Sequence, residues 1–301
     1  MAKKKQSTWL FKVIFVLGFL ILMYPQVSRL YYRVESTQEV STFESGKASL
    51  SDEEVQKRMA LAKDFNDSLV NQVAEDPYSK ARHERGRAAY ARMLEIHEQI
   101  GHIQIPTIDV DIPIRAGTSE EVLQTSAGHL EGTSLPIGGN SSHTVITAHS
   151  GLPTAKLFTD LNKVKKGDRF YIHNIAETLA YEVDQIKVVE PSNFDDLLIV
   201  PGHDYATLLT CTPIMINTHR LLVRGHRVPY EKAVDDQFVA DNKRDFLYKY
   251  AFIALMILIL LTSYGSWNYH KKLKRLEADI RAFEKVMGVK GDGKGAGDEE
   301  E

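Results

Sequence analysis

Cys211, the one cysteine of the chain, is the residue whose chemistry most needs an explanation. It ends an apolar run, Tyr205–Cys211, and precedes Thr212-Pro213, so we expect it where a strand passes into a loop, a common place for catalytic residues. The alternative is a buried structural thiol, because unreactive cysteines are among the most buried residues. A single cysteine excludes an intrachain disulfide and a metal site built from several thiolates.

A thiol becomes a good nucleophile at neutral pH when a nearby imidazole or cation stabilises its thiolate. Among the 11 histidines, His149 is the best-placed candidate, because it ends the strand-like run HTVITAH and is followed by a Ser-Gly-Leu-Pro loop. A purely structural histidine at a strand end is the alternative. His219 and His226 are rival imidazoles near the cysteine in sequence.

Arg220 is the candidate cation. Two strand-like runs flank the loop TPIMIN (212–217), and a hairpin around that loop would return Arg220 close to Cys211. A guanidinium there can hold a carbonyl oxygen that becomes an oxyanion, but it cannot act as a base. An ordinary surface charge is the alternative reading of Arg220, and Arg224 and Arg227 are rivals nearby.

The elements that must position these residues are mostly strands. Short runs alternate apolar and polar residues with a period of two, and turn-forming residues separate them. These runs are residues 102–114, 143–149, 169–174, 179–191, 205–211 and 220–228. Residues 154–164 predict one short helix between strands. Several short strands with few helices predict a mainly β fold, a closed β-barrel over residues 101–230.

Residues 51–100 predict helices that precede this barrel. Ser51 is a good N-cap and Glu54 completes a capping box. The tripeptide Asp76-Pro77-Tyr78 breaks the helix, because proline disfavours a helical residue before it, and a second helix is expected over residues 79–99.

Two apolar runs predict membrane-spanning helices. Residues 9–24 follow a cluster of lysines and predict an uncleaved signal anchor, with a cleaved signal peptide as the alternative. Residues 248–267 are apolar on every face, carry aromatic residues near both ends and precede a basic stretch. The basic flanks predict that both termini lie in the cytoplasm and that the region between the two apolar runs lies outside the cell.

The remaining segments connect or end these parts. Residues 1–24 comprise the cytoplasmic start and first anchor, 25–50 a tether, 231–247 a linker, and 268–301 a cytoplasmic amphipathic helix with a disordered acidic tail. The formal net charge of -3 argues against a nucleic-acid-binding protein, which usually shows a strong basic excess.

Two motifs resemble those of a known family. TLLTC, with an arginine nine residues after the cysteine, resembles the sortase signature, and GHLEGTSLPIGGNSSHTVITAHSGLPTAKLFTDL resembles the histidine region of class C sortases, which assemble pili. The resemblance extends from about Ser51 to Val228. It implies a closed eight-stranded sortase-type β-barrel with N-terminal helices and short connecting helices, beside the two expected transmembrane helices.

The resemblance also implies roles for individual residues. Cys211 would be the nucleophile, His149 its imidazole partner, and Arg220 the cation that stabilises the oxyanion. Asp76-Pro77-Tyr78 resembles the class C lid, in which Asp76 would face Arg220 and Tyr78 would cover Cys211. The residues expected to border the substrate groove are Thr210, Ser150, Ile214 and Met215.

The sequence departs from the family pattern at two places in that groove. Ile214-Met215 stand where Tyr-Gly is common, and Ser150 follows the histidine where a basic residue is common. The sequence preference of the groove is therefore the property least defined by the resemblance.

The implied function is that of a membrane-anchored cysteine transpeptidase. It would cleave an LPxTG-like sorting signal of a pilin precursor between Thr and Gly, form a thioester at Cys211, and pass it to a lysine amine of another pilin. No metal or organic cofactor is implied. The alternatives are a housekeeping sortase that anchors proteins to peptidoglycan, a simple cysteine protease, and a non-catalytic pilin-binding scaffold.

Overall fold

The computed structural model describes residues 8–69 and 93–287. The chain divides into two compact units, Met1–Lys243 and Arg244–Glu301. The first unit holds the β-barrel and the N-terminal helices. The described part of the second unit is the continuation of helix α5 (Lys232–Met287).

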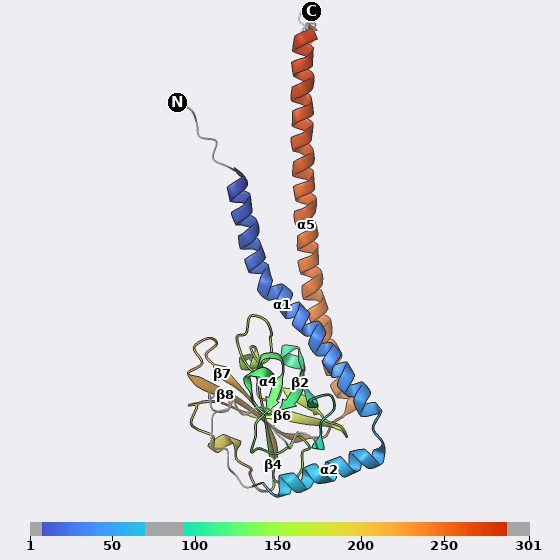
Figure 1. The fold of residues 1–301 in the computed structure, drawn as a ribbon, viewed down its shortest axis with the longest axis vertical. Coiled ribbons are helices and arrows are strands. Elements are labelled where there is room, and N and C mark those ends of the chain that lie inside the picture. The colour runs from blue at the N-terminus through green and yellow to red at the C-terminus, as the bar shows by residue number, and fades with distance from the viewer. Residues whose placement is uncertain (1–7, 70–92, 288–301) are drawn as a thin grey trace, which may run out of the picture. The chain divides into compact units, whose positions relative to one another are not determined.

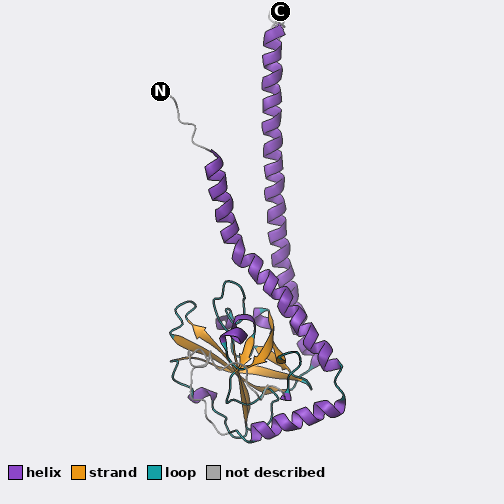
Figure 2. Ribbon diagram, viewed as in Figure 1, coloured by secondary structure: helices purple, strands orange, loops and turns teal. Residues whose placement is uncertain are grey.

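Eight strands close into a barrel in the first unit, as the resemblance to sortases implies (Figures 1 and 2). They are β1 (Gln99–Ile105), β2 (Val110–Ala116), β3 (Ala127–His129), β4 (Ser142–Thr147), β5 (Arg169–His173), β6 (Thr178–Val189), β7 (Asp204–Thr212) and β8 (His219–Val228). Around the barrel the order is β1-β2-β3-β4-β7-β8-β6-β5. The neighbouring pairs are antiparallel except β2 with β3 and β4 with β7, which are parallel.

The predicted strand over residues 102–114 is in fact two strands. A 3₁₀ turn, η2 (Pro106–Ile108), interrupts it, and Asp109 adopts the left-handed conformation with φ 50°. Aspartate tolerates this region better than most residues, so the chain can reverse here and pair β1 with β2. The apolar alternation continues on both sides of the turn, which explains why the sequence alone does not reveal the break.

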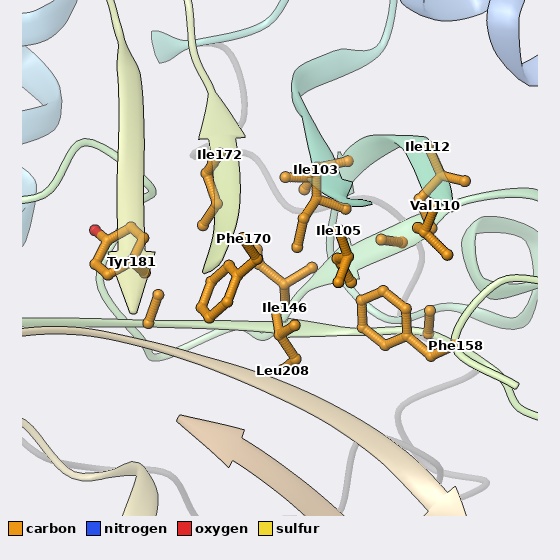
Figure 3. Close-up of a cluster of buried hydrophobic side chains, with 14 of the residues drawn as sticks. Ile103, Ile105, Val110, Ile112, Ile146, Phe158, Phe170, Ile172, Tyr181 and Leu208 are labelled. Carbon is orange, nitrogen blue, oxygen red and sulfur yellow. The ribbon is translucent and has the colours of Figure 1, made fainter. Parts of the chain in front are cut away.

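The barrel interior is a dense apolar core (Figure 3). Successive side chains of a strand point to opposite faces of the barrel wall, and strand β4 is buried along its whole length. The core side chains labelled in the figure are Ile103, Ile105, Val110, Ile112, Ile146, Phe158, Phe170, Ile172, Tyr181 and Leu208. Gly225 on β8 leaves space for this core, because an added Cβ would lie 2.8 Å from the ring of Phe170.

Short helices and turns connect the strands. Helix α4 (Glu120–Thr125) joins β2 to β3, and the 3₁₀ turns η3 (Leu161–Lys163) and η4 (Asp195–Leu197) lie between later strands. The helix predicted over residues 154–164 is therefore reduced to the short turn η3.

Helix α2 (Asp52–Asp67) begins where the sequence predicts. The Ser51 hydroxyl accepts a hydrogen bond from the Glu54 backbone N–H at 3.2 Å, so Ser51 is the N-cap. The side chain of Asn66 then fastens α2 to the barrel by donating to Leu135 O at 3.2 Å and accepting from Leu135 N at 2.7 Å.

Helix α1 (Thr8–Ala48) docks its C-terminal half on β1 and β2. Phe43 is completely buried, and Arg115 on β2 forms an ion pair with Glu39 at 3.0 Å. The Ser36 hydroxyl donates to Asp111 O at 3.0 Å. Most of the expected tether, residues 25–50, is thus helical and packed against the barrel.

The expectation of two transmembrane helices at residues 9–24 and 248–267 is wrong. Within the described residues, no helix combines the length and the apolar character needed to cross a bilayer. Both apolar runs form parts of longer helices, α1 with 41 residues and α5 with 56, which continue into polar sequence.

Candidate active site

Cys211 and Arg220 face each other across the β7–β8 hairpin. The two residues are direct partners in the antiparallel register, so their side chains lie on the same face. Cβ atoms of such partners are about 4.5–5.5 Å apart. The hairpin predicted from the sequence therefore forms, and it places Cys211 and Arg220 opposite each other on neighbouring strands.

Both side chains are largely covered by protein. Cys211 is 7% exposed and Arg220 is 6% exposed. The Arg220 guanidinium donates from Nη1 to the backbone oxygens of Asn217 and His219, each at 3.1 Å. These bonds tie the guanidinium to the end of the 212–217 loop and to the start of β8, which limits the positions that it can take.

His149 lies in a segment that side-chain hydrogen bonds hold beside the end of β7. The parallel pairing of β4 with β7 continues one residue past the end of β4, because Ala148 N donates to Leu209 O at 3.2 Å. The Thr210 hydroxyl then donates to Ala148 O at 2.7 Å, and the Ser150 hydroxyl donates to the backbone oxygen of Cys211, also at 2.7 Å. The residues on both sides of His149 are thus bonded to the strand that carries the thiol.

Glu120, which the sequence analysis does not single out, lies beside the imidazole. Its Oε1 atom is 3.6 Å from Nε2 of His149. Glu120 is the first residue of α4, whose N-cap Ser119 accepts a hydrogen bond from Val122 N at 3.4 Å. A carboxylate at this distance favours the charged form of an imidazole and helps to orient its ring.

A cavity of about 180 Å³ opens beside the thiol. Its lining residues are Ser150, Phe158, Thr159, Asn162, Thr210, Cys211, Thr212, Pro213, Ile214 and Leu221. Three of the four expected groove residues are among them, together with the cysteine. The fourth, Met215, is 85% exposed on the adjacent loop. His149 and Arg220 do not line this cavity.

The β-strand register separates Arg220 from its rivals. Arg224 and Arg227 pair with Thr207 and Tyr181, farther along β8 from the cysteine. Arg224 also forms a bidentate ion pair with Asp184 at 3.0 and 3.1 Å, so its guanidinium has a structural role.

The rival imidazoles are placed less well than His149. His219 is an exposed residue that pairs with Thr212. His226 pairs with Tyr205, at the far end of the hairpin from Cys211.

Two other histidines near these strands are buried and neutral. His143 Nδ1 donates to Leu198 O at 2.9 Å, while its Nε2 accepts from the Thr207 hydroxyl at 2.7 Å. His129 Nε2 donates to Ser134 O at 2.8 Å. Burial lowers the pKa of each imidazole to about 4, so neither is charged at neutral pH.

The expected lid, Asp76-Pro77-Tyr78, lies outside the described residues. Its relation to Cys211 and Arg220 stays a prediction.

Comparison with known proteins gives one family. A model of the Sortase domain matches residues 103–228. Sortase C-1 from Streptococcus pneumoniae is 68% identical, with a TM-score of 0.63, over 64% of this chain and 100% of that chain. The pilus-related Sortase C of Group B Streptococcus is 66% identical, with a TM-score of 0.61, over 64% of this chain and 97% of that chain.

A more distant likeness joins the chain to a curated sortase of another type. Sortase A of Bacillus anthracis is 27% identical over 135 residues, which make up 45% of this chain and 62% of that protein. The chain thus spans less than two thirds of the length of this relative. The higher identity to the Sortase C structures supports the class C branch.

Proposed function

Since the chain belongs to the sortase family of cysteine transpeptidases, in its class C branch, we propose that it cleaves an LPxTG-like sorting signal and transfers the product to an amine. The observation that carries this proposal is the direct pairing of Cys211 with Arg220, beside a segment that holds His149 against the same strand. In this proposal Cys211 is the nucleophile, Arg220 the donor to the oxyanion and His149 the proton carrier that acyl transfer requires.

In the first half of the reaction, the Cys211 thiolate attacks the carbonyl carbon of the signal's threonine. The carbonyl oxygen becomes an oxyanion, and the Arg220 guanidinium stabilises it. The C–N bond to glycine then breaks, and the imidazolium of His149 gives its proton to the departing amine. A thioester between the threonine carbonyl and Sγ remains.

In the second half, a lysine amine of another pilin attacks the thioester. The amine proton passes to His149, the C–S bond breaks, and an isopeptide bond forms while the thiolate returns. This acceptor is proposed on class C membership and on the similarity of the chain to the pilus-related Sortase C of Group B Streptococcus. Repetition of the cycle would polymerise pilins.

Cys211 is only 7% exposed, so we propose that the protein around the thiol moves to admit a peptide. We propose Asp76-Pro77-Tyr78 as the lid that controls access, on the resemblance of that tripeptide to the class C lid. Loops that close over a site and open for substrate are common in enzymes.

The direct test incubates the full chain with candidate pilins and scores high-mass ladders that resist boiling in detergent. Ladders with the parent chain and none with Cys211→Ala support the proposal. Signal peptide that is cleaved only to the hydrolysed acid would indicate a protease, and a signal transferred only to a peptidoglycan amine would indicate a housekeeping sortase. Binding of pilin without any acyl-enzyme would indicate a scaffold.

The expected location of the barrel outside the cell is part of the same proposal. Protease added to intact cells should degrade the barrel region if it is exposed there, and protection equal to that of a cytoplasmic marker would contradict this location.

A further inference from the structure

Three side chains of the types that bind metals lie together on elements away from the strand that carries the thiol. Glu44 of α1, His102 of β1 and His173 of β5 each offer one ligand atom within 4.8 Å of the other two. In the closed barrel, β1 is separated from β7 by three strands in either direction. This group is therefore independent of the cavity beside Cys211.

The two histidines are brought together by strand register. His102 and His173 are direct partners in the antiparallel pairing of β1 with β5, and their rings stack with centroids 4.1 Å apart. Glu44 approaches them from the docked half of α1, where its Oε1 is 3.2 Å from Nε2 of His102.

Each imidazole is oriented by a hydrogen bond at its other nitrogen. His102 Nδ1 donates to Asp111 Oδ1 at 2.8 Å, and His173 Nδ1 lies 2.9 Å from the Thr178 hydroxyl. Histidines that bind metals usually donate their second nitrogen to such a carboxylate or oxygen, which fixes the ring and the tautomer.

His173 provides a second, independent observation. Its Nε2 atom is fully enclosed, yet it has no hydrogen-bond partner among the described residues. A buried polar atom without a partner is costly and rare in folded proteins, so it calls for a physical explanation. A cation bound between His173, His102 and Glu44 would supply the missing partner.

We propose that Glu44, His102 and His173 bind a divalent transition-metal ion of the zinc class. Two imidazoles and a carboxylate are ligands that Zn²⁺ accepts, with water in the fourth position. Ligand atoms arranged tetrahedrally about 2.0–2.1 Å from zinc lie roughly 3.3 Å from one another. The distance between Glu44 Oε1 and His102 Nε2 is 3.2 Å, close to this value. Binding replaces the Glu44–His102 hydrogen bond, tilts the stacked rings so that both lone pairs meet the ion, and releases the Nε2 proton of His102 to solvent.

The consequence of this site is structural. The ligands come from α1, β1 and β5, so a bound ion would fasten α1 to the barrel. A ligand that binds only the folded chain stabilises it by mass action. The ion would therefore raise the unfolding temperature without taking part in acyl transfer.

The test uses the full chain without an affinity tag, stripped with a chelator and dialysed. All samples carry Cys211→Ala, because a thiolate beside an imidazole could itself bind zinc. Titration with Zn²⁺ and Co²⁺ is followed by calorimetry, by the visible spectrum of Co²⁺, and by the unfolding temperature. We expect one ion per chain, a tetrahedral cobalt spectrum, and a rise of several degrees in unfolding temperature.

Two site variants and one control decide the result. Glu44→Gln keeps the shape of a half-exposed side chain, and His173→Ala removes the enclosed nitrogen; each should weaken Zn²⁺ binding at least tenfold. His203→Ala, which removes an exposed histidine elsewhere, should leave the affinity unchanged. No binding of either metal at millimolar concentration, or equal affinity in Glu44→Gln and the parent, would overturn the proposal.

Discussion

Replacing Thr210 with valine removes the hydroxyl that ties the His149 segment to β7. Thr210 is 2% exposed, and its Oγ1 donates to Ala148 O at 2.7 Å. Valine has nearly the same shape, so the substitution deletes a hydrogen bond while leaving almost no cavity. The lost hydrogen bond joins Thr210, which precedes the nucleophile Cys211, to Ala148, which precedes the imidazole of His149.

The magnitude follows from the loss of a buried donor. A neutral hydrogen bond contributes about 1 kcal/mol net, and a desolvated carbonyl that loses a donor adds to the cost, so we expect the free energy of unfolding to fall by roughly 1–2 kcal/mol. Activity should fall further, because a shift of about 1 Å between reacting groups can reduce a rate by ~100-fold. We therefore expect at least a tenfold loss in kcat/KM.

Thr144 provides a matched control for the same substitution. It is also 2% exposed, on β4, but its hydroxyl has no hydrogen-bond partner among the described residues. Thr144→Val removes an unsatisfied polar atom, so the free energy of unfolding should stay the same or rise by up to about 1 kcal/mol.

Urea unfolding of the parent and both variants measures the stabilities, and cleavage of a sorting-signal peptide measures kcat/KM. Equal changes in the two variants would refute the reasoning. So would Thr210→Val with full activity, because the hydroxyl would then have no part in positioning the imidazole.

Three further predictions concern the surroundings of the site. Glu120→Gln should lower kcat/KM about two- to fivefold, since a partly exposed ion pair contributes up to ~1 kcal/mol. An unchanged kcat/KM would contradict a positioning role for Glu120. Burial lowers the pKa of His129 and His143 from 6.5 to about 4 in the folded chain. Between these values the unfolded chain binds more protons, so the free energy of unfolding falls as pH drops from 6.5 to 4, by about 1.4 kcal/mol per pH unit for each histidine. Urea unfolding of His143→Gln should show a shallower acid dependence than the parent, and parallel curves would exclude this cause. Tyr78→Ala should speed alkylation of the thiol by a mild electrophile if the tripeptide is a lid, and an unchanged labelling rate would argue against it.

Local sequence patterns predict the strands of the site well. The run Tyr205–Cys211 corresponds to β7, and the loop that follows it returns Arg220 to the cysteine, because alternation and turn residues encode a hairpin directly. The N-cap at Ser51 is equally local and is confirmed. Hairpins and caps depend on residues close in sequence, so a sequence reading can find them.

Contacts between residues far apart in the sequence cannot be predicted from such local patterns. Glu120 meets His149 only because α4 precedes β3 and β3 pairs with β4. His102 and His173 meet only through the register of β1 with β5. The three-residue strand β3 is too short to show any alternation.

The two membrane-spanning helices are the clearest error of the sequence reading. Apolar composition over 9–24 and 248–267 predicts spans when each run is taken by itself. In the structure, these runs belong to the longer helices α1 and α5, and the described part of the chain holds no helix fit to cross a bilayer.

The central claim is that Cys211, His149 and Arg220 act together on one carbonyl. Intact-mass spectrometry of the full chain, quenched in acid during reaction with an LPxTG-like peptide, tests it most directly. We expect a single adduct with the mass of the peptide up to its threonine, located on Cys211 and removed by hydroxylamine, and much less of it in Arg220→Ala and His149→Ala. Undiminished cleavage by Cys211→Ala, or an adduct on another residue, would contradict the account.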